Sequence, residues 1–279
     1  MKLYTINTGF FKLDGGAMHG VVPKSIWNKI NPADENNMCS WAMRCMLVEV
    51  DNKLILIDNG IGNKQSEKFF GYYYLHGDES LDKSLNKAGF SKGDITDMFL
   101  THLHFDHCGG SICYNKSGES YETNFPNATY WSQPDHWQWA TKPNPREKAS
   151  FLKENILPIE ESGQLNFVNE EGRLFPNFSV SFVDGHTEKM MIPHIRYSGR
   201  TVVFMADLIP SAGHIPVPYV MAYDTRPLLT LTEKEKFLKE AAEKNYVLFF
   251  EHDPKIECCT LETTDRGVKI KDTFRLNEI

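Results

Sequence analysis

The pattern of apolar and polar positions predicts a chain in which strands and helices alternate. Short apolar runs predict strands at 45–50, 53–58, 95–100, 128–132, 164–168, 178–183, 192–197, 201–206 and 246–251. Helical spacing of apolar residues occurs at 78–88, 145–157 and 227–245. The first two runs flank the polar pair Asp51-Asn52, which is typical of a β-hairpin. Residues 1–6 have the pattern of a first strand. Strands that alternate with helices in both halves indicate sheets covered by helices.

Residues 9–40 fit neither pattern, because glycines, prolines and asparagines interrupt their aromatic and aliphatic residues. A long irregular segment of this kind is often a functional loop, so we interpret it as an active-site flap. An Ω-loop that packs on the surface for stability is the alternative interpretation. We find no internal repeat, low-complexity segment or linker composition, and therefore expect one domain over residues 1–279.

Composition narrows the class of protein. The 279 residues are 41% hydrophobic and 24% charged, which is typical of a globular chain rather than a disordered one. The net charge of −7 disfavours nucleic acid as a partner. No apolar run approaches the ~20 residues that span a bilayer, so we expect no membrane association. The six cysteines form neither a CxxC pair nor a disulfide framework, which favours a reduced, cytoplasmic protein.

The segment 101–110 carries the most informative chemistry. Directly after a predicted buried strand it places four potential metal ligands within six residues, namely His102, His104, Asp106 and His107. His102 and His104 are two positions apart, so on an extended backbone they point the same way. We interpret Gly109 and Gly110 as residues that permit the turn that follows. Imidazole and carboxylate ligands together suit zinc and neighbouring metals.

One loop cannot close two metal sites, so further ligands should follow other strands. Three isolated candidates do: His186 after the run 178–183, Asp207 after 201–206 and His252 after 246–251. Sites carried on loops at sheet edges are built from such positions.

In this combination and order the chain resembles the metallo-β-lactamase superfamily. The resemblance rests on the HxHxDH segment, Gly185-His186, Asp207 and His252, and it begins with Asp58 in an early Leu-Ile-Asp-Asn-Gly segment. It implies an α/β (α+β) fold, an αββα sandwich of two mixed sheets flanked by helices, with the site at one edge.

The resemblance also implies a ligand set for two zinc ions, although iron, manganese or cobalt could occupy the same ligands. The first ion would take His102, His104 and His186, the second would take Asp106, His107 and His252, and Asp207 would bridge the two. A bridging hydroxide would then attack the substrate. Asp106 would orient this nucleophile or pass a proton to the leaving group. Asp58 would accept the free N–H of a ligand imidazole and fix its tautomer.

Two segments, 13–24 and 206–214, are similar to those of N-acyl homoserine lactonases and methyl-parathion-hydrolase-like enzymes. Similarity to this branch of the superfamily implies that the chain is a lactonase or an esterase. If it is a lactonase, its expected role is quorum quenching. An apolar ester or lactone is the expected partner. We expect an apolar pocket over the metals, lined by Met18, Val21, Val22, Trp27 and Phe105.

One position departs from the lactonase pattern. Where lactonases carry a tyrosine that binds the lactone carbonyl oxygen, three residues after the bridging aspartate, this chain has Pro210. Tyr223 or His214 is the candidate for the missing donor, and a place in the core is the alternative for each.

Other activities share these ligands. A phosphotriesterase or arylesterase of the methyl-parathion-hydrolase type is the first alternative. A phosphodiesterase and a glyoxalase-II-like thioesterase or persulfide dioxygenase are less favoured, because the chain shows neither a basic balance nor an identifiable glutathione site. A purely structural metal site in a partner-binding protein is the non-enzymatic alternative. A homodimer formed through the aromatic N-terminal segment is a further expectation.

Overall fold

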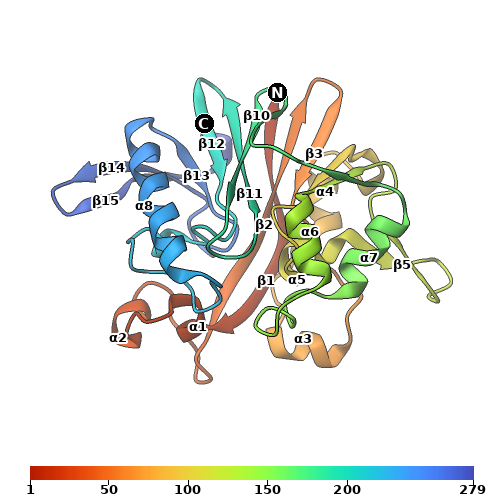
Figure 1. The fold of residues 1–279 in the computed structure, drawn as a ribbon, viewed down its shortest axis with the longest axis horizontal. Coiled ribbons are helices and arrows are strands. Elements are labelled where there is room, and N and C mark those ends of the chain that lie inside the picture. The colour runs from red at the N-terminus through yellow and green to blue at the C-terminus, as the bar shows by residue number, and fades with distance from the viewer.

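Two mixed β-sheets pack face to face, with helices on their outer surfaces (Figure 1). The computed structural model describes all 279 residues. The first sheet has the strand order β1 (Lys2–Asp14), β2 (Met38–Val50), β3 (Lys53–Ile57), β4 (Asp97–Phe99), β7 (Thr129–Ser132), β8 (Leu165–Phe167). The second has the order β15 (Gly267–Phe274), β14 (Cys258–Thr264), β13 (Val247–Phe249), β12 (Arg200–Phe204), β11 (Met190–Tyr197), β10 (Phe178–Val183), β9 (Gly172–Phe175). A small hairpin pairs β5 (Ile112–Tyr114) with β6 (Tyr121–Thr123).

Helices cover both outer faces. The helices of the chain are α1 (Gly15–His19), α2 (Lys24–Trp27), α3 (Glu67–Tyr73), α4 (Leu81–Lys87), α5 (Phe105–Cys108), α6 (Pro134–Thr141), α7 (Lys153–Glu161) and α8 (Pro227–Glu243), with 3-10 turns at Lys92–Asp94, Gly109–Ser111, Ala212–His214 and Leu276–Glu278. In Figure 1, α4, α6 and α7 lie outside the first sheet, and α8 lies outside the second. None of the helices combines the length and apolar character that a bilayer crossing requires.

The strand β2 shows why the first sheet has a hydrophobic core on each of its two faces. Successive side chains of a strand point to opposite faces. Accordingly, Met46 and Val48 belong to the core between the two sheets, whereas Cys45 and Leu47 belong to the core under α4, α6 and α7. A strand that is apolar on both faces has to be covered on both, which gives the αββα sandwich expected from the sequence.

Most of the predicted elements are confirmed. The hairpin forms around Asp51, which takes a left-handed φ of 51°, and every predicted strand coincides with an observed strand. The helices predicted at 78–88 and 227–245 appear as α4 and α8. The strands β5, β6, β9, β14 and β15 are additional to those predicted.

The prediction of an irregular segment over 9–40 is wrong at both ends. Strand β1 continues to Asp14 and pairs with β2, which begins at Met38. A register shift at Thr8–Gly9, where Gly9 has a φ of +112°, interrupts the alternation by which this strand could have been recognised. Only residues 15–37 leave the sheet. The homodimer through this segment stays a prediction.

The helix predicted at 145–157 is confirmed only for residues 153–157. Residues 145–150 form turns, and α7 begins only at Lys153. The turns are stabilised locally, because the Asn144 side chain accepts hydrogen bonds from the backbone N–H groups of Arg146 and Glu147. This non-helical course lets the segment contribute side chains to the site described below.

The two sheets are joined by the loop that follows β13. The backbone N–H groups of Ala42 and Arg44, on β2, donate to the carbonyls of His252 and Glu251 at 3.1 and 3.0 Å. The buried Arg44 guanidinium also donates to the carbonyl of Phe250 (2.6 Å) and to that of Asp253 (3.0 Å). The loop after β13 of the second sheet is therefore fixed to β2 of the first.

His19, in the segment 15–37, and His214 form a pair of buried histidines. Their rings stack at 4.7 Å between centroids with an interplanar angle of 2°, and the ring of Trp27 stacks on His19 at 5.5 Å with an angle of 9°. Neither ring nitrogen of His19 has a hydrogen-bond partner. Burial lowers the pKa of His19 to about 4, so the ring is neutral in the folded protein at neutral pH.

This histidine should make the fold sensitive to acid. The unfolded chain binds a proton at a histidine pKa of ~6.5, whereas the folded chain does so at about 4, so stability is lost as the pH falls between these values. In His19→Phe the free energy of unfolding should fall less steeply over this range, by up to about 3 kcal/mol. Urea unfolding at several pH values measures this slope. Trp27→Phe, which changes the same stack without removing a titratable group, should keep the wild-type slope, and an equal slope in His19→Phe would contradict the assignment.

Candidate metal centre

The seven predicted ligands come together at one edge of the two sheets. His102 lies in the loop after β4, His104 directly precedes α5, and Asp106 and His107 lie within α5. His186 follows β10, Asp207 follows β12 and His252 follows β13. All seven are buried. Residues far apart in the sequence meet here because both sheets end at this edge.

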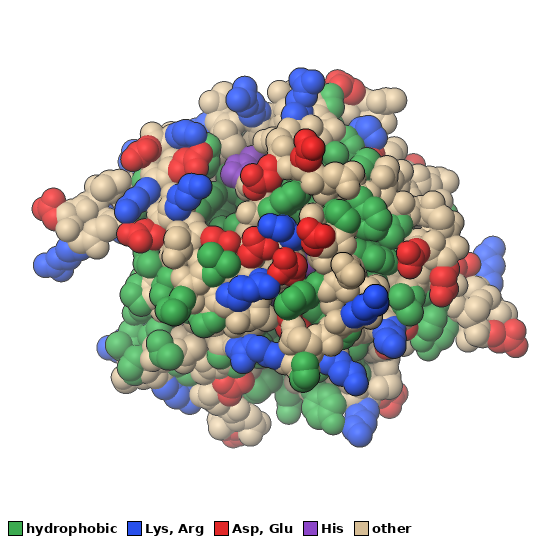
Figure 2. Space-filling model, in the orientation of Figure 1, with side chains coloured by type: hydrophobic (Ala, Val, Ile, Leu, Met, Phe, Trp, Pro, Cys, Tyr) green, Lys and Arg blue, Asp and Glu red, His purple; other side chains and the backbone are tan.

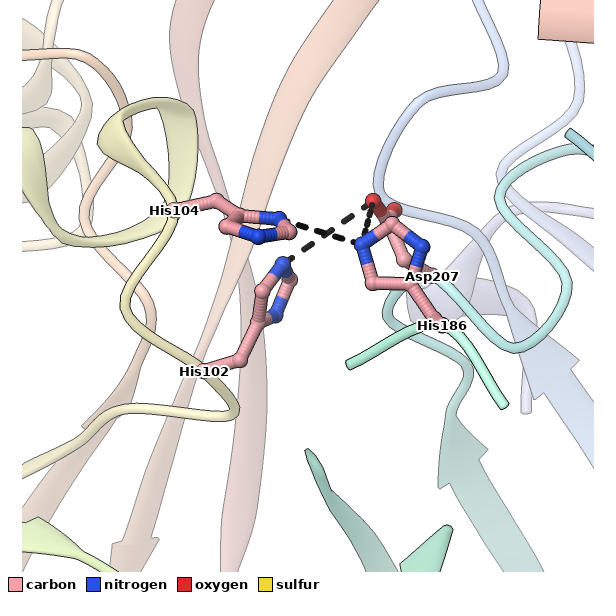
Figure 3. A group of neighbouring side chains, drawn as sticks. All are labelled: His102, His104, His186 and Asp207. Carbon is pink, nitrogen blue, oxygen red and sulfur yellow. Dashed lines mark hydrogen bonds and ion pairs between the residues drawn. The ribbon is translucent and has the colours of Figure 1, made fainter. Parts of the chain in front are cut away.

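One group consists of His102, His104, His186 and Asp207, with their ligand atoms all within 4.8 Å of one another. Figure 3 shows His102 and His104 facing His186 and Asp207 across a small gap. His104 Nδ1 lies 3.1 Å from His186 Nε2, and Asp207 Oδ2 also lies 3.1 Å from His186 Nε2. Three imidazoles and a carboxylate thus converge, which is the donor set that zinc prefers.

A second group consists of Asp106, His107 and His252. The Nε2 atoms of His107 and His252 are 3.1 Å apart, and Asp106 Oδ2 lies 3.7 Å from each. Asp207 reaches this group as well, because its Oδ1 lies 3.2 Å from His252 Nε2. Asp207 therefore stands between the two groups, as a bridging ligand would.

The donor atoms fit a pair of cations. His102 Nε2 and Asp207 Oδ1 are buried without a hydrogen-bond partner, a costly state for polar atoms in a protein interior. Two pairs of imidazole nitrogens face each other at 3.1 Å, where a cation would be favourable. Burial lowers the pKa of His186, but the charges of Asp207 and Asp224 outweigh burial and raise it to about 10. The carboxylates around His186 therefore favour positive charge at this ring, whereas burial and the neighbouring imidazoles lower the pKa of His102.

Carboxylates hold the outward-facing nitrogens of three of these rings. His107 Nδ1 lies 3.1 Å from Asp58 Oδ2, as the sequence predicts for Asp58. Sequence analysis missed Asp224, whose Oδ1 lies 2.9 Å from His186 Nδ1, and Glu147, whose Oε1 lies 3.5 Å from His104 Nε2. Partners of this kind fix the ring and raise its strength as a ligand.

The other two rings are fixed by neutral oxygens. His252 Nδ1 lies 2.8 Å from the carbonyl oxygen of Ala42, and His102 Nδ1 lies 3.1 Å from Thr101 Oγ1. Each of the five imidazoles thus has one nitrogen directed at the centre and the other near an oxygen.

Glu147 shows how the turn at 142–152 serves the site. It accepts hydrogen bonds from Thr187 Oγ1 at 2.6 Å, from Trp139 Nε1 at 2.7 Å and from Asn144 Nδ2 at 2.5 Å. Burial raises the pKa of Glu147, but the bonds to His104 and Thr187 outweigh it and lower the pKa to about 2. Glu147 is therefore a carboxylate under physiological conditions.

The two glycines after the motif are needed because a side chain would not fit at these positions, not because the backbone there takes a conformation that only glycine favours. Gly109 has ordinary right-handed angles, φ −60° and ψ −31°. A Cβ at Gly109 would lie 2.1 Å from the carbonyl oxygen of Ile61, and one at Gly110 would lie 2.4 Å from that of Asn59. The left-handed residues of the site are instead Asp58 (φ 57°) and Ala206 (φ 42°), next to Asp207. Strained non-glycine backbone of this kind is common at functional sites.

A cavity of about 330 Å³ opens above the two groups. Its lining includes both metal-facing residues and an apolar wall: Leu13, Met18, Tyr73, His104, Phe105, Asp106, Arg146, Glu147, Ala149, Ser150, His186, Asp207, Met221, Ala222, Tyr223 and His252. Met18 and Phe105 thus lie where the sequence predicts. Tyr73 and Met221 are lining residues that no motif indicated. On the face shown in Figure 2, acidic and basic side chains are interspersed.

Three of the predicted pocket residues do not line this cavity. Val21 is 90% exposed on the surface, because it follows the turn at Gly20. Val22 and Trp27 are buried in the small core with Trp41, behind Met18. The apolar spacing of this segment identified buried positions correctly in two cases, but could not distinguish a core from a pocket.

Of the two candidate donors, only Tyr223 lies in the cavity wall, where 39% of its surface remains exposed. The prediction that His214 donates a hydrogen bond to the substrate is wrong. Its ring is buried, with Nδ1 2.7 Å from Ser211 Oγ and Nε2 2.8 Å from the carbonyl oxygen of Met18. Both nitrogens are therefore used to hold the segment below the cavity.

Comparisons with known proteins agree with this geometry. The family model described as "Metallo-beta-lactamase superfamily" matches residues 44–252. An N-acyl homoserine lactonase of Bacillus thuringiensis is 22% identical over 267 residues, which cover 90% of this chain and 93% of that protein. A probable metal-dependent hydrolase from Staphylococcus aureus has a TM-score of 0.88 at 29% identity, with 98% of this chain and 96% of the other covered. AidC, a dizinc quorum-quenching lactonase, has a TM-score of 0.77 at 24% identity, with coverages of 98% and 94%. The chain belongs to the metallo-β-lactamase superfamily and is one of its hydrolases.

Proposed function

We propose that this chain is a dinuclear zinc hydrolase that opens a lactone or cleaves an ester, with N-acyl homoserine lactones as the favoured class. The observation that carries the proposal is a pair of ligand groups, joined by Asp207, at the floor of a cavity with an apolar wall. The similarity to N-acyl homoserine lactonases and to the dizinc lactonase AidC supports it.

His102, His104 and His186 would hold one zinc ion and Asp106, His107 and His252 the other, with Asp207 between them. When bound, two zinc ions lower the pKa of a coordinated water toward ~7 and polarise the carbonyl group of the substrate. The protein's part is to keep seven donors in place. It does so with the oxygens behind the imidazoles, so that little reorganisation accompanies the reaction.

The cavity wall supplies the selectivity. Leu13, Met18 and Met221 contribute apolar surface to the lining, and Phe105 packs against Tyr73 at 4.7 Å between ring centroids. Burial of an acyl chain on such a wall is favourable by ~25 cal/mol for each Å² removed from water. This supports a substrate with an apolar acyl part.

Tyr223 is the donor that we assign to the carbonyl oxygen of the substrate. Burial in the wall and the nearby Tyr73 raise the pKa of Tyr223, so its hydroxyl keeps its proton and donates. Asp106, which also lines the cavity, is the group that would orient the attacking water and pass a proton to the leaving oxygen.

A panel of three substrates tests the proposed activity. The zinc-loaded protein should hydrolyse a long-chain N-acyl homoserine lactone with a higher kcat/KM than an aryl acetate or an aryl phosphotriester, because only the first combines an acyl chain with a cyclic ester. Turnover of the phosphotriester above the other two would instead indicate an activity of the methyl-parathion-hydrolase type. Absence of all three activities in a protein that contains two zinc ions would contradict the proposal.

Replacement of Tyr223 tests its assignment. Tyr223→Phe should lower kcat for the lactone by ~10²–10³, the usual cost of losing one well-placed donor, with the zinc content unchanged. Tyr73→Phe is the matched control, because it removes a second hydroxyl from the same wall, and it should retain most of the activity. Equal kcat values for Tyr223→Phe and the wild type would exclude the donor role.

A further inference from the structure

Glu251 is a buried carboxylate beside the site for which no motif or partner accounts. It follows β13 and directly precedes His252, and its side chain is fully buried. Neither of its oxygens has a hydrogen-bond partner. Oε2 lies 3.0 Å from Nδ1 of His107.

His107 consequently has two carboxylates behind it, whereas no other ring of the site has more than one. Asp58 already occupies the hydrogen-bonding position at 3.1 Å. Asp58 is itself fixed by the backbone N–H of Thr101 at 2.8 Å and by Thr101 Oγ1 at 2.6 Å. The orientation of the His107 ring is thus determined without Glu251, so Glu251 contributes negative charge rather than geometry.

The packing of the loop does not explain Glu251 either. The hydrogen bond that fixes residue 251 to β2 uses its backbone carbonyl, which accepts from the N–H of Arg44 at 3.0 Å. Any residue at this position would keep that bond. A fully buried carboxylate near a second carboxylate destabilises a protein unless a cation compensates for both.

We propose that Glu251 is a positioning residue that strengthens zinc binding at the second position through His107. Its charge lies on the far side of the imidazole from Nε2, which faces Asp106 and His252. A negative charge there makes Nε2 a stronger donor toward a cation. Glu147 lies behind His104 of the first group in the same way, so each group has a carboxylate of its own behind one of its imidazoles. The inference rests on the proposed dinuclear site, but not on the identity of the substrate.

The test uses Glu251→Gln in the full-length chain, because glutamine keeps the shape of the side chain and removes its charge. Zinc is removed with a chelator, and zinc binding is then titrated in competition with a chromogenic chelator. We expect one of the two zinc dissociation constants to rise ~10–100-fold, and the other to stay unchanged. Glu147→Gln should raise the other constant, and the double variant should raise both. Glu251→Asp, which retains the charge, should recover part of the lost affinity.

A second buried carboxylate provides the control for the zinc titration. Asp97→Asn is the matched control: Asp97 is also buried, but it pairs with Lys53 at 2.8 Å away from the site. This variant should lose stability and keep both zinc constants.

Each outcome is decisive. Unchanged zinc constants in Glu251→Gln would overturn the inference. A wild-type chain that binds only one zinc ion would overturn both the inference and the proposed dinuclear site. Two zinc ions with the expected shifts, in a protein that hydrolyses no lactone or ester, would uphold the inference and contradict only the proposed reaction.

Discussion

The carboxylate of Asp207 is the constraint on which the rest of the site depends. Its two oxygens lie 3.1 Å from His186 and 3.2 Å from His252, so it links the two groups of ligands. The site concentrates five imidazoles and two carboxylates in a buried volume. Such a concentration is unfavourable in the absence of cations. The backbone just before Asp207 is left-handed, at Ala206, as is common for strained residues at functional sites.

The fold serves this constraint by bringing two sheets to one edge. The HxHxDH loop follows β4 of the first sheet, whereas His186, Asp207 and His252 follow strands of the second. The sheets alone would leave their relative position to apolar packing, which is not directional. The hydrogen bonds between β2 and the loop at residues 250–253 add direction, because Arg44 fixes that loop through its backbone and its guanidinium. Ligands from both sheets can then keep one geometry.

The sequence predicts the parts of this structure that depend on local patterns. Short apolar runs indicated the strands, and isolated histidines and an aspartate after those runs indicated where ligands gather. The pattern failed where a single residue interrupts a period, as Gly9 does in β1, and where side-chain hydrogen bonds replace helix formation, as those of Asn144 do. Neither event has a signal in the spacing of apolar residues.

The groups behind the ligands could not be predicted for a different reason. Glu147, Asp224 and Glu251 have no common spacing from the histidines that they contact, because the contacts are formed by the three-dimensional approach of separate loops. The same limit applies to the cavity. Val21 and Met18 are both apolar residues of one short segment, yet one is on the surface and the other lines the cavity.

The central claim is that two zinc ions, bridged by Asp207, are required for hydrolysis, and stepwise reconstitution tests it most directly. Zinc would be added in known equivalents to the chelator-treated protein, and lactone turnover would be measured with the bound zinc at each step. The account predicts that turnover reaches its maximum only as the second equivalent binds. Full turnover at one equivalent, or turnover in the zinc-free protein, would contradict it.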